Sequence, residues 1–280
     1  MNVCVKIALS MSKLNLTPTN IARLKTKDLI VFDLDGTLAP TKARMDGEMA
    51  RLMHKLLLAK KVAVIGGGKY GLFKEQFLDE LKAPKELFKH LYLFPASSTS
   101  FFKYNKGWKQ VYAHTLPKAT VKKIFESFEK VFKDIKYEQP KKIYGKVIED
   151  RGTQVTFSAL GQDVVKVLGK KGILLKNKWR DQNRKLKLKI AAHLRKLLPN
   201  LEIHAAGHTS IDVTKKGIDK AYGLRQIEKY LHVPIKKMLF IGDAIFKGGN
   251  DYAVVRTGVD YMPVDDPGGT KKIVRALLKD

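Results

Sequence analysis

The chain has 280 residues, of which 44% are hydrophobic and 29% charged, and this composition excludes a disordered chain because it buries enough apolar surface to offset the entropy of ordering. The single cysteine, Cys4, excludes a disulfide scaffold and favours the cytoplasm, and no apolar run reaches the about 18 residues of a membrane span. The formal charge of +27 is compatible with three kinds of binding partner: nucleic acid, a membrane surface or a small anionic substrate. It is equally compatible with a basic surface that has no partner. We expect no signal peptide in Met1–Met11, because Lys6 interrupts its apolar residues.

The first part of the chain alternates between strand and helix patterns. The short apolar runs Leu29–Phe32 and Val62–Ile65 end at Asp33 and Gly66, as buried parallel strands do when they enter tight loops. Helical spacing follows each of them, over residues 46–59 and 72–81. This β-α-β-α order predicts a doubly wound parallel sheet with right-handed crossovers.

The middle of the chain has a different pattern. A helix is predicted to begin at Thr120, and its apolar side chains share one face: Val121, Ile124, Phe125, Phe128 and Phe132. Residues 154–158 alternate as in a strand with one exposed face, and a second amphipathic helix fits residues 184–198 before Pro199. Alternating strands with helices predict an α+β module built on an antiparallel sheet.

The first pattern returns near the C-terminus, with a helix over 222–230 and a buried strand at Met238–Ile241 that ends in Gly242-Asp243. The predicted fold class is therefore α/β, a Rossmann-like doubly wound parallel core interrupted by an α+β cap domain. Residues 1–116 form the first part of the core, with 1–26 as an N-terminal extension. Residues 117–214 form the cap, and 215–280 form the second part of the core.

Polar and glycine-rich loops follow three of the predicted strands. Asp33 and Asp35 follow the first, Gly66–Gly68 the second, and Asp243 with Gly248–Asp251 the last. Ligands of open α/β sheets bind beyond the carboxyl ends of the strands, where these loops meet. Carboxylates in such a place suit Mg²⁺, and an aspartate there can also attack a phosphorus atom. A turn is the alternative role of an isolated Asp-Gly pair.

These loops carry a specific resemblance. Phe32–Thr37 (FDLDGT) resembles the DxDGT signature of the haloacid dehalogenase superfamily, and Gly242-Asp243 with Gly248–Asp251 resembles its GD…GGND motif. That form is typical of the HAD-IIB group, to which the eukaryotic-type phosphomannomutases and their bacterial relatives belong. Gly217–Tyr222 is similar to the segment that carries the group's lysine. The resemblance covers about Leu29 to Lys272 and implies a cap inserted after about the third strand.

The resemblance also implies roles for these residues. Asp33 is expected to be the nucleophile, Asp35 the general acid/base, and Lys220 the cation that neutralises the phosphoryl oxygens. The Mg²⁺ ligands and their support are expected among Asp33, Asp35, Asp243, Asn250 and Asp251. Without the surrounding motif, the interpretation of Lys220 would be a solvated lysine at the start of a helix.

The glycine loop departs from the superfamily pattern, which has a Ser or Thr after the second strand. Backbone N–H groups of Gly66 and Gly67 can bind a phosphate without a hydroxyl, and Lys69 adds a nearby charge. The alternative to phosphate binding is that the glycines of this loop only allow close packing.

Three cap segments resemble those that hold the sugar and its distal phosphate in the phosphomannomutase group, namely Glu149–Gly152, Phe157–Gln162 and Thr209–Asp212. By this resemblance Arg151 clamps a phosphate, and Ser210 and Asp212 bind sugar hydroxyls. A salt bridge from Arg151 to Glu149 or Asp150 is the alternative. Gln162 stands where the eukaryotic mutases carry an arginine. Losing that cation favours hydrolysis over isomerisation, unless another cap cation compensates: Lys166, Lys178 or Arg180.

The leading hypothesis is therefore a Mg²⁺-dependent phosphatase acting on a phosphorylated sugar through an aspartyl-phosphate, with a phosphomannomutase as the alternative. A basic nucleic-acid-associated protein on the same scaffold is a distant third, because the full acidic set is present and no nucleic-acid motif is. We expect no membrane partner and at most non-specific nucleic-acid binding. The resemblance permits a homodimer formed through the cap, and no residue pattern demonstrates one.

Overall fold

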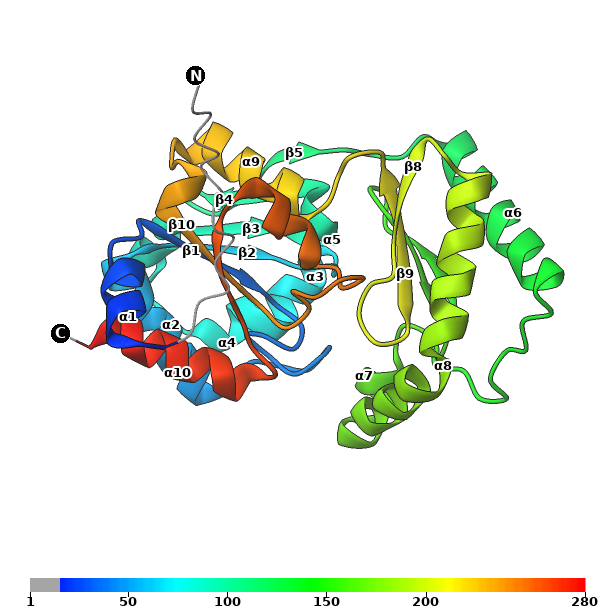
Figure 1. Ribbon diagram of the computed structural model, residues 1–280, viewed down its shortest axis with the longest axis horizontal. Coiled ribbons are helices and arrows are strands. Elements are labelled where there is room, and N and C mark those ends of the chain that lie inside the picture. The colour runs from blue at the N-terminus through cyan, green and yellow to red at the C-terminus, as the bar shows by residue number, and fades with distance from the viewer. Residues whose placement is uncertain (1–15, 280) are drawn as a thin grey trace, which may run out of the picture.

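The computed structural model describes residues 16–279, so the expectation for Met1–Met11 lies outside the described residues. Within that range the strands form two sheets, each with helices packed on it (Figure 1). The larger sheet has the order β11-β10-β1-β2-β3-β4-β5, and the smaller has the order β6-β7-β9-β8. The two sheets and their helices form the two halves of the molecule in Figure 1, and we call them the core and the cap.

The centre of the core sheet is parallel. Alternate residues of its middle strand pack on opposite faces, Ile30 and Phe32 in one apolar cluster and Leu29 and Val31 in another. This two-sided burial explains why the strand reads as a continuous apolar run. The parallel strands are β1 (Leu29–Asp33), β2 (Lys61–Ile65), β3 (Leu91–Phe94), β10 (Met238–Gly242) and β11 (Asp260–Pro263).

One edge of the core sheet is an antiparallel hairpin, β4 (Ser100–Tyr104) and β5 (Trp108–Ala113), which the sequence patterns did not predict. Its residues are mostly half-buried or exposed, so they form no continuous apolar run. The chain consequently enters the cap after the fifth strand, and the expectation of an insertion after about the third strand is wrong.

Helices cover both faces of the core sheet (Figure 1). Aspartates cap three of them, since Asp46, Asp219 and Asp266 each accept a hydrogen bond from a backbone N–H three residues on, at 2.9–3.0 Å. The helices are α1 (Pro18–Lys25), α2 (Gly47–Ala59), α3 (Tyr70–Phe73), a π-helical turn (Lys74–Leu78), α4 (Asp79–Leu81), α5 (Pro95–Ser98), α9 (Lys220–Leu231) and α10 (Pro267–Leu278), with 3₁₀ turns at Lys85–His90, Ile235–Lys237 and Tyr252–Thr257.

The N-terminal helix α1 packs on α10 and is tied to the core by charge. Arg23 and Lys27 both pair with the buried Asp260, at 2.6 and 2.5 Å. The described part of the predicted N-terminal extension is thus built onto the core.

The cap sheet is antiparallel, as the alternating pattern predicted, and α6 with the second part of α8 lies on the side away from the core (Figure 1). Phe128, Phe157 and Leu194 belong to the apolar cluster between sheet and helices. The strands are β6 (Ile148–Asp150), β7 (Val155–Ser158), β8 (Leu201–His204) and β9 (Ser210–Lys215), and the helices are α6 (Lys118–Asp134), α7 (Val164–Leu168) and α8 (Lys170–Leu197).

The long cap helix α8 starts well before the predicted residue 184. Its backbone departs from helical dihedrals at Asn183, with φ −121° and ψ 15°, and the predicted helix corresponds to the part after this kink. The earlier part is rich in lysine and contains Gly172, so its apolar residues do not show a clear helical spacing in the sequence.

Candidate active site

The three motif loops meet at one edge of the core sheet. In the parallel register Asp33 lies beside Ile65, directly before the glycine loop, and Phe32 lies beside Ile241, two residues before Asp243. The carboxyl ends of β1, β2 and β10 therefore bring the three loops together, as the strand pattern predicted.

Lys220 is the first residue of α9, and its side chain points into the core with only 1% of its surface exposed. Its ammonium group donates to Oδ1 of Asp33 and to Oδ1 of Asp251. Burial alone lowers the pKa of Lys220, but the charges of Asp251 and Asp33 outweigh burial and raise it. Lys220 is therefore a fixed buried cation and not a solvated lysine at a helix start.

Three carboxylates surround this lysine. Asp33, Asp243 and Asp251 each offer an oxygen atom, and these atoms lie within 4.8 Å of one another. Burial, opposed by Lys220, raises the pKa of Asp33, and burial followed by the charge of Asp251 raises that of Asp243 to about 7. Negative charge held so closely stabilises a bound cation, and carboxylate oxygens are the hard ligands that Mg²⁺ takes in proteins.

Gly36 lets the β1 loop approach these carboxylates. It has φ +89°, and a Cβ atom built on it would lie 2.5 Å from Oδ2 of Asp243. The glycine of the DxDGT motif is therefore required by the site itself and not only by a turn.

Asp35 is half-buried and lies apart from the three-carboxylate group. Its Oδ1 accepts hydrogen bonds from the backbone N–H of Lys42 at 2.6 Å and from the side-chain amide of Gln76 at 3.3 Å. These donors hold the carboxylate in the lining of the cavity.

The glycine loop lies against an unusual stretch of backbone. Ala96, Ser97 and Ser98 have φ values of +49° to +73°, a region that non-glycine residues rarely adopt. The N–H of Ser97 donates to the carbonyl oxygen of Gly66 at 2.8 Å. The hydroxyl oxygen of Ser97 lies 4.0 Å from the place where a Cβ atom of Gly67 would stand, so a hydroxyl from the end of β3 borders the glycine loop, which the sequence patterns did not indicate.

Lys69 does not project freely beside that loop. It pairs with Glu149 of the cap at 2.9 Å, and its side chain is 60% exposed.

Arg151 makes the salt bridge to Glu149 that was the alternative to a phosphate clamp, and it also contacts two neutral acceptors. It donates to Glu149 at 2.8 Å as a salt bridge, to the carbonyl oxygen of Gly67 at 3.0 Å, and to Oε1 of Gln162 at 3.0 Å. The same Oε1 accepts from Lys42 at 3.1 Å. The amide of Gln162 therefore holds two cations together where an arginine would repel them.

Ser210 and Asp212 lie on β9, on the sheet face that looks toward the core, and both line the cavity. Asp212 is buried and accepts a hydrogen bond from the hydroxyl of Thr156 at 2.8 Å. Burial raises its pKa, and Arg151 opposes this.

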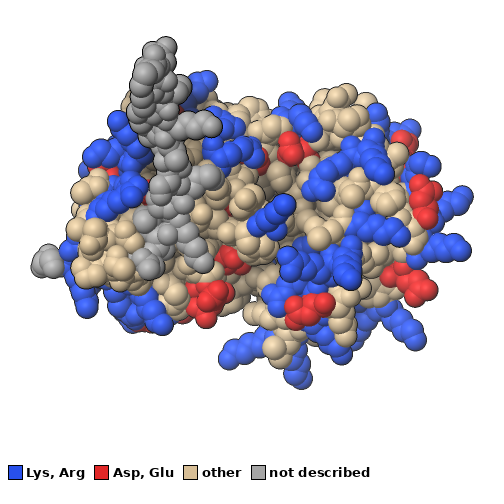
Figure 2. All heavy atoms as spheres, viewed as in Figure 1, with Lys and Arg blue, Asp and Glu red and all other residues tan. Residues whose placement is uncertain are grey.

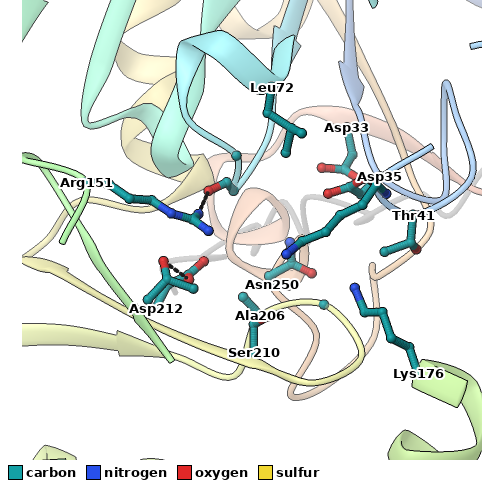
Figure 3. Close-up of a pocket in the computed structure, with 15 residues that line it drawn as sticks. Asp33, Asp35, Thr41, Leu72, Arg151, Lys176, Ala206, Ser210, Asp212 and Asn250 are labelled. Atoms are coloured by element: carbon teal, nitrogen blue, oxygen red, sulfur yellow. Dashed lines mark hydrogen bonds between the residues drawn. The ribbon is translucent and has the colours of Figure 1, made fainter. Parts of the chain in front are cut away.

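A narrow cavity separates the carboxylate edge of the core from the cap sheet (Figure 3). It holds about 60 Å³, whereas typical ligand pockets hold about 300–1,000 Å³. The contacts that close it join the two halves directly: Lys42 to Gln162, Arg151 and Gln154 to Gly67, and Lys69 to Glu149. These contacts narrow the space between core and cap, so that the cavity itself is smaller than a sugar phosphate.

Asn250 lines the same cavity from the core side. Sequence reasoning missed three other residues of this site, namely Lys42, Gln76 and Lys176. Lys42 and Gln76 come from irregular or weakly patterned segments. Lys176 lies in the part of α8 that the patterns did not identify as a helix. Nothing in the sequence therefore distinguishes it from the many other lysines.

Basic side chains are spread over both halves of the molecule on the face seen in Figure 2, with few acidic ones between them. Most of the charge of +27 therefore lies on the surface and not in the cavity. The described helices include none with the length and hydropathy that a membrane crossing requires.

Comparison with known proteins agrees with the geometry. A family model of haloacid dehalogenase-like hydrolases matches residues 30–255. A phosphomannomutase of Encephalitozoon cuniculi is 28% identical over 263 residues, which cover 90% of this chain and 94% of that protein. The Plasmodium falciparum IMP-nucleotidase structure aligns with a TM-score of 0.68 at 19% identity, covering 92% of this chain and 71% of that one.

The Aspergillus fumigatus trehalose-6-phosphate phosphatase structure aligns with a TM-score of 0.53 at 15% identity, covering 92% and 95% of the two chains. The two structural likenesses concern the fold, an α/β core with a second, antiparallel sheet as its cap. The family model spans most of the sequence and includes all three motif loops at the carboxylate edge. The chain therefore belongs to the haloacid dehalogenase-like hydrolases, and it is an enzyme of phosphotransfer, a phosphatase or a mutase.

Proposed function

We propose that this enzyme is a Mg²⁺-dependent sugar-phosphate phosphatase that works through an aspartyl-phosphate on Asp33. The observation that carries this proposal is the buried group of Asp33, Lys220, Asp251 and Asp243, which faces the cap across a closed cavity. Residues 117–214 act as the cap that admits the substrate and then excludes bulk water.

In the first step an oxygen of Asp33 attacks the phosphorus atom, and the bond between phosphorus and the sugar oxygen breaks. Lys220 donates to Asp33 and thereby orients the nucleophile and offsets charge on the phosphoryl oxygens. Asp35 gives its proton to the departing sugar oxygen. In the second step Asp35 takes a proton from water, the water oxygen bonds to phosphorus, and phosphate leaves Asp33.

The donor set fits Mg²⁺, because Asp33 and Asp243 offer hard oxygen atoms and Asn250 lines the same cavity. When bound, the ion polarises the phosphoryl oxygens and reduces repulsion between substrate and carboxylates. Both oxygens of Asp251 are already occupied, by Lys220 and by the N–H of Ala244 at 3.1 Å, so Asp251 supports the site by holding Lys220.

Gln162 favours hydrolysis over isomerisation. A mutase must hold a doubly phosphorylated intermediate at both ends while it turns over, and the eukaryotic mutases place an arginine at this position. Here the amide oxygen of Gln162 binds Arg151 and Lys42 to each other. A phosphomannomutase remains the second candidate. The similar proteins of Encephalitozoon cuniculi and Saccharomyces cerevisiae are phosphomannomutases, and they match this chain over almost their full length.

The test incubates the enzyme and Mg²⁺ with mannose 1-phosphate, with and without a trace of hexose 1,6-bisphosphate. Release of free phosphate in both reactions supports the phosphatase. Formation of mannose 6-phosphate only when the bisphosphate is present supports the mutase and contradicts our proposal.

Asp33→Asn serves as the mechanistic control. It retains a hydrogen-bonding group beside Lys220 but cannot form the aspartyl-phosphate, so turnover should fall about a thousandfold or more. The exposed cap residue Asp150 offers the matched control Asp150→Asn, which should keep at least half of the activity. Full turnover by Asp33→Asn would overturn the mechanism.

A further inference from the structure

The second part of the cap helix α8, after the kink at Asn183, carries only positive charge. Residues 184–197 contain six basic residues and no acidic one. Lys187 is buried, and the five others are exposed, namely Arg184, Lys185, Lys189, Arg195 and Lys196. With about 3.6 residues per turn, these five side chains lie within about 140° of the helix circumference. They therefore form one face, which we call the α8 basic face.

The charge of the α8 basic face is not balanced within the described residues, because none of its five side chains forms an ion pair there. The hydrogen bond of Arg195 goes to a neutral acceptor, the carbonyl oxygen of Ile203, at 2.8 Å. Lys185 and Lys189 are four residues apart, so their like charges repel each other and destabilise the helix. A face with this repulsion gains stability when it meets an anion.

The neighbouring cap helix α6 shows how a solvated basic helix is built in the same domain. It has five lysines and three acidic residues, and two ion pairs join residues four apart: Lys122 with Glu126 at 3.8 Å, and Lys130 with Asp134 at 3.5 Å. The two helices pack against each other on the same side of the cap sheet (Figure 1). Contact with solvent therefore does not by itself explain why the α8 basic face lacks acidic residues.

The shape and chemistry of the α8 basic face favour a nucleic acid over a membrane as its partner. From Arg184 to Lys196 the face extends about 18 Å, and each strand of a duplex carries about five phosphates over that length. Arg184 and Arg195 offer planar guanidinium groups, which bind phosphate through two hydrogen bonds. A helix that lies in a membrane surface needs a free apolar face. In α8 the apolar side chains Ile190 and Leu194 are instead buried in the cap.

We propose that the α8 basic face binds the phosphate backbone of nucleic acid, independently of base sequence. Three of its lysines, Lys185, Lys189 and Lys196, line neither the active-site cavity nor the wider cleft of about 740 Å³ that adjoins it. This binding is therefore separate from the proposed function, and the failure of either leaves the other standing. It also assigns a partner to part of the charge of +27.

The experiment measures binding of the full chain to fluorescein-labelled duplexes of about 20 base pairs by fluorescence anisotropy, at about 50 to 200 mM salt. One duplex is RNA and the other DNA, both of arbitrary sequence. Vesicles of phosphatidylcholine and phosphatidylserine test for a membrane as the partner. The test variant combines Lys185→Gln, Lys189→Gln and Lys196→Gln.

The control variant combines Lys103→Gln, Lys106→Gln and Lys109→Gln on the exposed hairpin β4–β5 of the core, so it loses the same charge as the test variant. The test variant should bind the duplexes about tenfold or more weakly than the unaltered protein at about 100 mM salt. Its plot of log affinity against log salt should become shallower by about 2–3, which is about 0.9 for each lost phosphate contact. The control variant should change the affinity less than about threefold.

The duplex that binds more tightly identifies RNA or DNA as the source of the phosphates. The melting temperature of the test variant should not fall, because the substitutions relieve the repulsion between Lys185 and Lys189. Its phosphatase activity should match that of the unaltered protein, since the three lysines lie outside the cavity and the cleft.

Equal weakening by the test and control variants would overturn this inference, because the affinity would then follow the net charge and not the α8 basic face. Absence of duplex binding by the unaltered protein at about 50 mM salt would overturn it too. Vesicle binding that the test variant loses, with duplex binding unchanged, would assign the face to a membrane and overturn the inference as well.

Discussion

On the core side of the active-site cavity, carboxylates outnumber cations: Asp33, Asp243 and Asp251 surround one buried lysine, and all come from loops at strand ends. On the cap side the balance is reversed. Lys176 is buried and makes no hydrogen bond or ion pair with the described residues, and Arg151 donates a hydrogen bond to Gln162. The core side supplies the chemistry common to phosphoryl transfer, while the cap side meets the remainder of the substrate. Changes to the two sides should therefore have different effects.

The largest effect should come from Lys220→Met. This change leaves Asp33 and Asp251 as buried carboxylates without their cation, so the free energy of unfolding should fall by about 3–5 kcal/mol and turnover should be lost. Urea denaturation and phosphate release measure the two effects. Lys229→Met, on the exposed side of the same helix, is the control. A loss of activity without any loss of stability would show that Lys220 acts on the substrate alone.

The pH dependence of stability should depend on Mg²⁺. Burial and the charge of Asp251 raise the pKa of Asp243 from its ordinary 3.8 to about 7. Between these values the folded metal-free protein holds a proton that the unfolded chain has lost, so the free energy of unfolding decreases as pH rises through this window. Mg²⁺ competes with that proton and should raise the melting temperature by several degrees more at about pH 8 than at about pH 5. Melting curves with Mg²⁺ and with a chelator test this, and an equal effect at both pH values would contradict it.

A smaller effect should follow Gln162→Arg, which gives the cap side a further cation. The variant loses the acceptor shared by Arg151 and Lys42 and should melt a few degrees lower without ligand, while its affinity for hexose 1,6-bisphosphate should rise about tenfold. Formation of mannose 6-phosphate should rise relative to free phosphate. Gln110→Arg, on the exposed edge strand β5, controls for added charge. Unchanged bisphosphate affinity would show that residue 162 does not separate hydrolysis from isomerisation.

The smallest effect should come from Lys69→Gln. Its ion pair with Glu149 joins core and cap, but the lysine is largely exposed, and such pairs contribute about 0–1 kcal/mol. We expect KM to change less than about twofold in steady-state assays. A tenfold rise in KM would mean that Lys69 contacts the phosphate in the open state, as the sequence position beside the glycine loop suggested.

The strand pattern alone predicted which motif residues meet at the carboxylate edge of the core. Asp33, Asp35, Asp243 and Asn250 follow buried strands, and parallel strands place such residues at one edge whatever the rest of the chain does. The alternating strands of the cap and the class of the fold followed from the same periodicities. The order of strands beyond the third did not, because the half-exposed hairpin β4–β5 carries no continuous apolar signal.

Which of the many basic residues line the cavity depends on how the cap packs against the core. Lys176 and Lys178 are two residues apart and look alike in the sequence, yet one is buried in the cavity and the other is exposed. Lys42 and Gln162 are 120 positions apart and meet only because the cap folds back on the core. The charge of a side chain is written in the sequence, but its environment depends on which face of a helix it occupies and on what packs against that face.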